Sequence, residues 1–216
     1  MDGLPLASPP SQLYGHVVPT TRYVGRDFLI FQVVFQPGVL SRLLGIPATE
    51  LVNQMVDAEA VLGTEIRRVN EQLANTAAAL DMVPVVEAYL ARLIGRAPAA
   101  PPLERIGQLL LQRPGQLSVD WLAGQACLSP RQFQRRFVAH RGIGPKLFAR
   151  VARFDQAMRL RNACPQHDWL TVALHAGYHD YQHLVRDFGQ FTTLTPTGFW
   201  RRDRQAPERA FGEAEV

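Results

Sequence analysis

The chain has 216 residues, of which 47% are hydrophobic and 19% charged, a composition typical of a globular protein with one large or two small domains. No run approaches the roughly 20 apolar residues that cross a bilayer, and the N-terminus lacks signal-peptide regions, so the sequence argues against membrane association and predicts a cytoplasmic protein. The net charge of +4 divides unevenly, because residues 1–102 hold 7 basic and 9 acidic side chains (−2) while residues 103–216 hold 16 basic and 10 acidic (+6).

The N-terminal half mixes one strand signal with several helical ones. Residues 27–35 (DFLIFQVVF) are β-branched and aromatic and predict a strand that is apolar on both faces. Apolar residues then recur at helical spacing within 40–44, 66–73 and 85–94. A lone strand leaves its backbone groups unpaired. Either a partner strand therefore lies in residues 12–26, where YGHVV is the candidate, or part of the domain lies outside this chain.

Residues 97–102 (APAAPP) contain three prolines in six positions and predict a non-helical, semi-rigid linker. We expect an N-terminal sensor or interaction domain over 1–96, this linker, a helical domain over 103–204 and a tail over 205–216. Helices are expected at 103–111, 118–127, 130–140, 145–161, 169–176 and 181–191. The predicted fold class is mainly α, with a smaller N-terminal α+β part.

Residues 118–142 (SVDWLAGQACLSPRQFQRRFVAHRG) predict a helix-turn-helix unit. Ala123, in the first helix, is small enough to let a second helix cross closely after a turn at Cys127. Ser129, followed by proline and then by Gln132 three positions on, is a capping-box pattern. The pattern predicts a well-defined start for the second helix.

On this second helix, Phe133 and Phe137 stand at i and i+4 and are expected to face the core. The residues turned outward are Arg131, Gln134, Arg135 and Val138. Arginine and glutamine suit guanine and adenine edges in the major groove. Arginine supplies every basic residue except Lys146, although a GC-rich genome would give the same bias.

A diverged copy of this unit occupies residues 169–191 (WLTVALHAGYHDYQHLVRDFGQF). Gly177 allows a turn with positive φ, Asp180 is the expected cap of the next helix, and Leu184 and Phe188 repeat the i, i+4 pair. The outward residues are Tyr181, Gln182, Val185 and Arg186. Arg135 and Arg186 stand 51 positions apart (186 − 135) at equivalent places, which indicates an internal repeat.

The two units are joined by a predicted helix over 145–161, about 25 Å long at about 1.5 Å per residue. Its expected apolar stripe consists of Leu147, Phe148, Val151, Phe154 and Met158. Such a helix would set the spacing of the two units. Recognition helices about 34 Å apart can enter successive major-groove segments on one face of a duplex.

Residues 103–202 resemble the DNA-binding region of the AraC/XylS family of transcription regulators over its whole length. The agreeing stretches are LAGQACLSPRQFQRRF, GPKLFARVARFDQAMRL and ALHAGYHDYQHLVRDFGQFTTLTPTGFWR. The resemblance implies seven helices and a sequence-specific regulator of bacterial transcription that binds double-stranded DNA. The implied base-contacting residues are Arg131, Gln134 and Arg135 in the first unit and Tyr181, Gln182, Val185 and Arg186 in the second, and we add Gln132 as a further candidate.

Three positions depart from the family pattern, which usually has an apolar residue at Arg141, serine at Gly144 and glycine at Thr193. The last departure concerns the loop after the second recognition helix, because a β-branched residue resists positive φ. The N-terminal stretch VVFQPGVLSRLLGIPATELVNQMVDAEAVLG is similar, more distantly, to the end of a cupin-like sensor domain of the same family. The sequence leaves the effector unknown.

Two other functions stay open at this point: a methyl-acceptor DNA-repair fusion and a protein-interaction module that does not bind DNA. Cys127 and Cys164 lie far apart, without a CxxC or Cys/His cluster, which predicts reduced thiols and no zinc site. The histidines at 175, 179 and 183 have helical spacing, but Gly177 interrupts the helix. We therefore expect no enzyme activity, metal or cofactor. RNA polymerase and a second copy of the chain, through its N-terminal half, are candidate partners, and the expected location is the cytoplasmic nucleoid.

Overall fold

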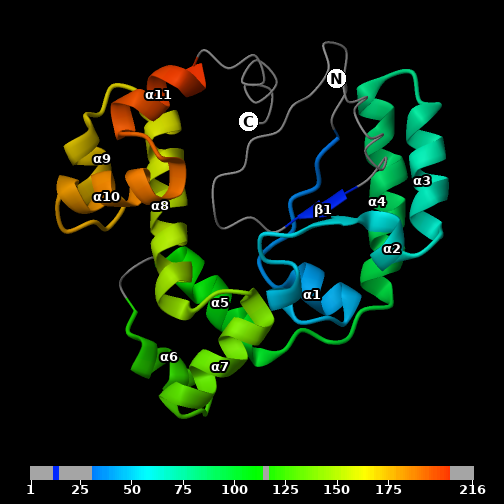
Figure 1. The fold of residues 1–216 in the computed structure, drawn as a ribbon, viewed down its shortest axis with the longest axis horizontal. Helices are drawn as coiled ribbons and strands as arrows, with labels where there is room; N and C mark the ends of the chain where they lie inside the picture. Colours follow the sequence, from blue (N-terminus) through cyan, green and yellow to red (C-terminus); the bar gives the residue numbers. More distant parts are fainter. Residues whose placement is uncertain (1–11, 15–30, 114–116, 205–216) are drawn as a thin grey trace, which may run out of the picture. The chain divides into compact units, whose positions relative to one another are not determined.

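The computed structural model describes residues 12–14, 31–113 and 117–204. These residues form eleven α-helices, one 3-10 turn and two short strands (Figure 1). The predicted mainly helical fold class is therefore confirmed. Among the described helices, none is both long and apolar enough to cross a bilayer.

The described chain divides into two compact units, and helices α5 and α7 contribute residues to both. The first unit contains residues 12–14, 31–105 and 134–144, and the second contains residues 106–113, 117–133 and 145–204.

The first unit opens with a two-stranded antiparallel sheet. Strand β1 (Gln12–Tyr14) pairs with β2 (Met55–Asp57), and Leu13 lies opposite Val56. The helical elements of its N-terminal part are α1 (Val39–Leu44), η1 (Ala48–Glu50), α2 (Ala58–Leu62), α3 (Glu65–Ala74) and α4 (Ala79–Gly95). Helices α1, α3 and α4 confirm the three helical stripes expected from the sequence.

A small hydrophobic core holds α2, α3 and α4 together. Ala58, Ile66, Val69 and Tyr89 are buried in it. Helices α3 and α4 lie side by side (Figure 1), and Glu65 on α3 accepts hydrogen bonds from Arg92 and Arg96 at the end of α4.

The strand expected over 27–35 is wrong for residues 31–35, which form no regular structure, while 27–30 lie outside the described residues. Val34 is 81% exposed, and Phe31 and Val33 are each 38% exposed, so within the described residues no layer covers the run and no strand pairs with it. The sheet instead pairs β1 with β2. Of the candidate YGHVV, only Tyr14 is described, and it belongs to β1.

The C-terminal half contains seven helices in its described residues, the number that the resemblance implies. They are α5 (Pro102–Gln112), α6 (Val119–Gln125), α7 (Pro130–Arg141), α8 (Pro145–Ala163), α9 (Trp169–His175), α10 (Tyr181–Thr192) and α11 (Pro196–Arg204). Pro102, which the sequence assigned to a non-helical linker, is the first residue of α5. Proline suits that position because the first helical residue needs no amide donor.

In the second unit, helices α8, α9 and α10 pack around one aromatic and aliphatic core (Figure 1). Phe188 on α10 is fully buried, and its ring makes edge-to-face contacts with Phe154 at 4.8 Å and Trp169 at 5.2 Å between centroids. The other buried members are Ala157, Val172, Ala173, Ala176, Tyr178 and Leu184.

The apolar stripe expected on α8 is only partly correct, because Val151 is 37% exposed. Phe148 and Ala152 are buried in the first half of the helix, and Ala157 is buried in the second half. At about 100° per residue, Ala157 lies about half a turn around the axis from Phe148. The buried face of α8 therefore changes along its length, and Val151 falls between the two buried faces.

Candidate nucleic-acid interface

The first helix-turn-helix consists of α6, a short turn and α7. Cys127 adopts the left-handed conformation (φ 53°), and the next amide, of Leu128, donates to the Ala123 carbonyl at 3.0 Å. The expected capping box is present. The backbone N–H of Gln132 donates to Ser129 Oγ at 3.3 Å, and the backbone N–H of Ser129 donates to the side-chain oxygen Oε1 of Gln132 at 3.2 Å. These bonds satisfy donors that every helix start leaves unpaired.

Helix α7 presents a polar face to solvent because its apolar pair points inward. Phe133 and Phe137 are 0% exposed, as the sequence predicted. Arg131, Gln134 and Arg135 are exposed, and none of them makes an ion pair within the described part of the chain. Val138, also expected outside, is half-buried. Gln132 is exposed, but its amide oxygen is engaged in the capping box.

The second helix-turn-helix repeats this local geometry in α9 and α10. Gly177 has φ 81°, as the sequence predicted, and the Tyr178 amide donates to the Ala173 carbonyl at 3.0 Å, which matches the bond in the first turn. Asp180 caps α10 by accepting the His183 amide at 2.8 Å. That backbone hydrogen bond is the main cause that lowers the pKa of Asp180 below its usual value.

Helix α10 buries Leu184 and Phe188, each 0% exposed, and turns its polar residues outward. Of the four predicted contact residues, Gln182 and Arg186 are exposed, and Tyr181 and Val185 are half-buried. The Tyr181 side chain packs against the core of this unit. The exposed surface of α10 is thus narrower than that of α7.

A buried carboxylate anchors α10 to α8. Asp187 is 4% exposed, and its Oδ1 accepts two hydrogen bonds from the Arg150 guanidinium at 2.5 and 3.1 Å. Its Oδ2 accepts the Tyr178 hydroxyl at 3.0 Å, and Arg153 lies over the Tyr178 ring at 4.6 Å. Burial, with the Asp187 charge second, raises the pKa of Tyr178, so its hydroxyl stays a donor. Asp187 directly follows Arg186, so this network fixes the helix that carries the exposed arginine.

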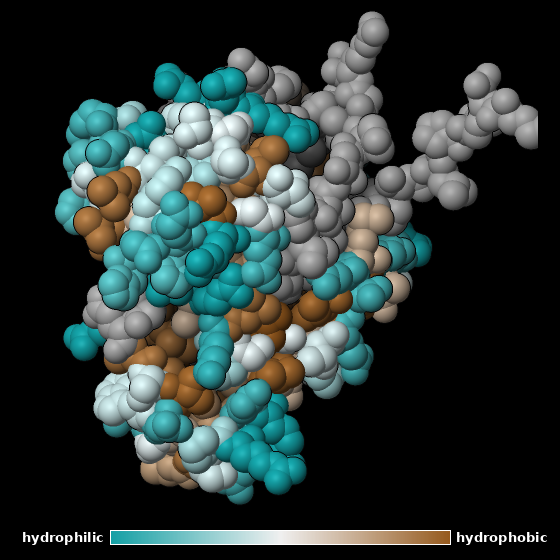
Figure 2. Space-filling view, turned by 60° about the vertical axis from the view of Figure 1, so that its left-hand side comes forward, coloured by the Kyte–Doolittle hydropathy of each residue, from teal (hydrophilic) through white to brown (hydrophobic). Residues whose placement is uncertain are grey.

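Arginines outside the predicted set extend the basic surface. Arg136, beside Arg135, is exposed and makes no ion pair in the described residues, and Arg201, Arg202 and Arg204 are exposed at the end of α11. The signal that could have found the three arginines of α11 is charge near a helix end, and for Arg136 it is the place beside Arg135 on α7. Figure 2 shows that hydrophilic side chains cover much of the face it draws, with smaller apolar patches between them.

The histidines and cysteines form no candidate centre in the described part of the chain. His179 stacks on His183 at 6.4 Å between ring centroids, and His183 Nδ1 contacts Asp180 at 2.9 Å. No group of three or more metal-ligating side chains occurs among the described residues. Cys127 is exposed and Cys164 half-buried, each as a free thiol.

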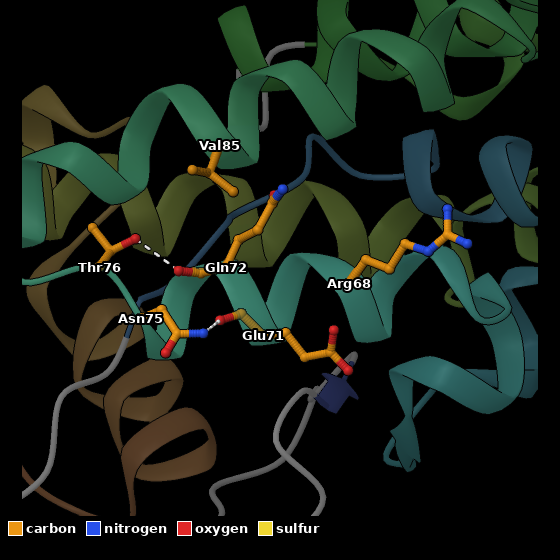
Figure 3. Close-up of a pocket in the computed structure, with 6 residues that line it drawn as sticks. All are labelled: Arg68, Glu71, Gln72, Asn75, Thr76 and Val85. Atoms are coloured by element: carbon orange, nitrogen blue, oxygen red, sulfur yellow. Dashed lines mark hydrogen bonds between the residues drawn. The ribbon is translucent and has the colours of Figure 1, made fainter.

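A shallow pocket lies between α3 and α4 (Figure 3). Its lining residues are Arg68, Glu71, Gln72, Asn75, Thr76 and Val85. Most of these side chains are exposed. The Asn75 side-chain amide donates a hydrogen bond to the Glu71 carbonyl, and the Thr76 hydroxyl donates one to the Gln72 carbonyl, as Figure 3 shows. The pocket is a depression on the surface of a helix pair, with no enclosed volume for an effector.

Comparisons with known proteins find a family match and several similar solved structures. Residues 122–202 match the family described as "Helix-turn-helix domain". Curated protein sequences give no match. The chain is similar to the solved DNA-binding domain of AdpA, a global transcriptional factor, in complex with a target DNA, at 26% identity over 49% of this chain and 96% of that one, with a TM-score of 0.45.

Two further solved structures are similar to parts of the chain. A DNA-binding transcriptional dual regulator from Escherichia coli K-12 is 17% identical over 50% of this chain and 98% of that one, with a TM-score of 0.43. ToxT from Vibrio cholerae O395 is 9% identical over 67% of this chain and 58% of that one, with a TM-score of 0.45.

Proposed function

We propose that this chain is a DNA-binding transcription regulator of the AraC type and that it reads two successive major-groove segments, one with α7 and one with α10. The match of residues 122–202 to a helix-turn-helix domain family supports the proposal. The observation that carries the proposal is the matched burial of an i, i+4 pair on each helix. Phe133 and Phe137 on α7 point inward, as do Leu184 and Phe188 on α10. Polar residues on both helices are therefore left free for DNA.

On α7, we propose that Arg131, Gln134 and Arg135 contact base edges. The guanidinium of arginine can donate two parallel hydrogen bonds to guanine O6 and N7, and the amide of glutamine can pair with adenine N6 and N7. The capping box supports this role, because it fixes where α7 begins and hence which side chains stand on its first two turns. Gln132 has a smaller part, since its oxygen already caps the helix.

On α10, we propose that Gln182 and Arg186 contact base edges and that Tyr181 and Val185 make apolar contacts with bases or sugars. This division follows their exposure. The 19-residue helix α8 is about 28 Å long at about 1.5 Å per residue. A connector of that length suits two recognition helices that enter grooves about 34 Å apart.

The partners and location follow from this role. A DNA-binding regulator of this type works on the nucleoid, in the bacterial cytoplasm, and its contact with RNA polymerase is part of the proposal. A homodimer through the N-terminal half is supported by apolar side chains left exposed on α4, where Leu80 is 84% and Ile94 54% exposed. Sedimentation of the purified chain would test the dimer.

Replacement of Arg135 by alanine tests base reading on α7. We expect Arg135→Ala to weaken binding to a duplex selected with the wild-type chain by about 1–3 kcal/mol and to relax preference at one base position. Fluorescence anisotropy against the selected and random duplexes measures both effects. The control is Arg68→Ala, which removes an exposed arginine from α3. Equal losses on both duplexes would assign Arg135 to phosphate and contradict base reading.

A further inference from the structure

Three charged side chains, of which Glu104 and Arg141 are buried and Arg42 is half-buried, lie together where α1, the start of α5 and the end of α7 meet in the first unit. Glu104 and Arg141 are each 8% exposed. Arg42 Nε donates to Glu104 Oε2 at 3.0 Å, and its Nη1 donates to the Pro98 carbonyl at 2.9 Å. Arg141 Nη2 donates to the Glu104 carbonyl at 2.9 Å. One residue, Glu104, thus joins a helix of the N-terminal half to the recognition helix α7.

Two glycines allow close packing at this contact. A Cβ on Gly142 would lie 2.4 Å from Val52 Cγ2 and 3.2 Å from the Ala48 carbonyl oxygen. A Cβ on Gly38 would lie 3.1 Å from His140 Nε2. Residues 38–52, which we call the docking segment, therefore pack directly on the last turn of α7.

Buried charge makes this contact specific as well as close. Burial lowers the pKa of Arg141 to about 10, and the Glu104 charge opposes that change only in part. A charged group taken out of water is costly unless its hydrogen bonds are made, so a shifted docking segment would leave the Glu104 carboxylate without the hydrogen bond from Arg42. The contact therefore favours one position of the segment on α7.

We propose that Arg42 and Glu104 are positioning residues for DNA reading, because they hold the end of α7 and so set the direction in which Gln134 and Arg135 face the duplex. Arg135 stands six residues before Arg141 on the same helix, about 9 Å along its axis. A helix end that moves by a small angle displaces the reading side chains with it. The inference rests on the proposed function and makes base reading depend on Arg42, a residue outside the matched domain.

The test uses the full chain with Arg42→Met, which removes the ion pair and keeps much of the apolar stem. Arg67→Met is the matched control, because Arg67 forms an ion pair with Glu59 in the same unit. Two DNA probes are used: a duplex selected from random-sequence DNA with wild-type protein, and the unselected random duplex. Amide hydrogen exchange of residues 138–142 reports the end of α7, and exchange of 184–188 reports α10.

We expect Arg42→Met to speed exchange at 138–142 by about tenfold or more and to leave 184–188 unchanged. We expect its Kd for the selected duplex to rise about tenfold and its Kd for random duplex to change less than about twofold. Arg67→Met should match wild type in all four measurements.

A folded Arg42→Met chain with wild-type exchange at 138–142 and wild-type selectivity overturns the inference and leaves the proposed function intact. A wild-type chain that binds no duplex overturns the proposed function instead. If Arg42→Met does not fold, Arg42→Lys replaces it, because lysine keeps the charge but cannot bond Glu104 and Pro98 through a planar fork. Lysine should give a smaller loss of selectivity in the same direction, and full wild-type selectivity would again overturn the inference.

Discussion

Single backbone conformations decide how each recognition helix begins and ends. Gly177 and Cys127 both hold the left-handed conformation in the turn before a recognition helix, and Thr193 holds it directly after α10 with φ 62°. Glycine adopts this conformation without cost, whereas a residue with a Cβ loses about 1–2 kcal/mol there. The sequence identified Cys127, Gly177 and Thr193 as turn positions, and for Gly177 and Thr193 it also raised the question of positive φ. It did not predict the positive φ of Cys127, because a cysteine has no preference for that conformation.

Thr193→Gly should stabilise the chain. The change removes the conflict between a β-branched residue and positive φ at the C-cap of α10, where glycine is the favoured residue. Greater freedom of glycine in the unfolded chain opposes this gain, so we expect the free energy of unfolding to rise by about 0.5–1 kcal/mol.

Urea unfolding followed by circular dichroism measures the effect. Thr192→Gly is the control, since Thr192 is in the last turn of α10 and its hydroxyl donates to the Phe188 carbonyl at 2.8 Å. That change should destabilise the chain. Destabilisation by both substitutions would show that Thr193 carries no backbone strain.

At the scale of elements, the sequence correctly predicted the features that depend on nearby residues, such as helix caps and buried i, i+4 pairs. The capping box at Ser129, the cap at Asp180 and the two buried i, i+4 pairs are confirmed, because each depends on residues within one helical turn. The predicted burial of Val151 and the predicted strand over residues 31–35 were wrong. Both depend on which distant element covers a surface, and periodicity gives no information about that.

His140, near the end of α7, should make the free energy of unfolding depend on pH. Burial lowers the pKa of His140, the Arg141 charge lowers it further, Glu104 raises it, and Arg42 lowers it again. The unfolded chain, with an ordinary histidine pKa near 6.5, therefore binds more protons than the folded chain below that pH. The stability present above about pH 6.5 is then lost as the pH falls toward the lower folded pKa.

We expect the free energy of unfolding to decrease from pH 7.5 to pH 5.5, and His140→Gln to reduce this slope. Urea unfolding at four pH values between 5.5 and 7.5 measures the slope of the free energy of unfolding against pH. The matched control is His179→Gln, since His179 is exposed. Equal slopes for His140→Gln and wild type would show that His140 is not held neutral by its surroundings.

At the scale of the whole molecule, charge and long-range contacts carry the function. The split between −2 and +6 in the two halves of the chain was visible in the sequence and favours an acidic partner for the C-terminal half. The contact of Arg42 with Glu104 was not visible, because 62 positions separate the two residues. Arg141, which departs from the family pattern, is explained by its hydrogen bond to the main-chain carbonyl of the same Glu104.

Salt dependence tests the charge argument for the whole chain. Each phosphate that the protein neutralises releases condensed counterions, so log K should fall linearly with log salt by about 0.9 per contact. Arg136 is exposed, unpaired within the described residues and adjacent to the reading face of α7. We therefore expect Arg136→Gln to reduce the slope by about 0.9 and to weaken selected and random duplexes equally. Arg159→Gln is the control, because Arg159 already pairs with Asp155 at 2.8 Å. An unchanged slope for Arg136→Gln, or a loss confined to the selected duplex, would assign Arg136 to another role.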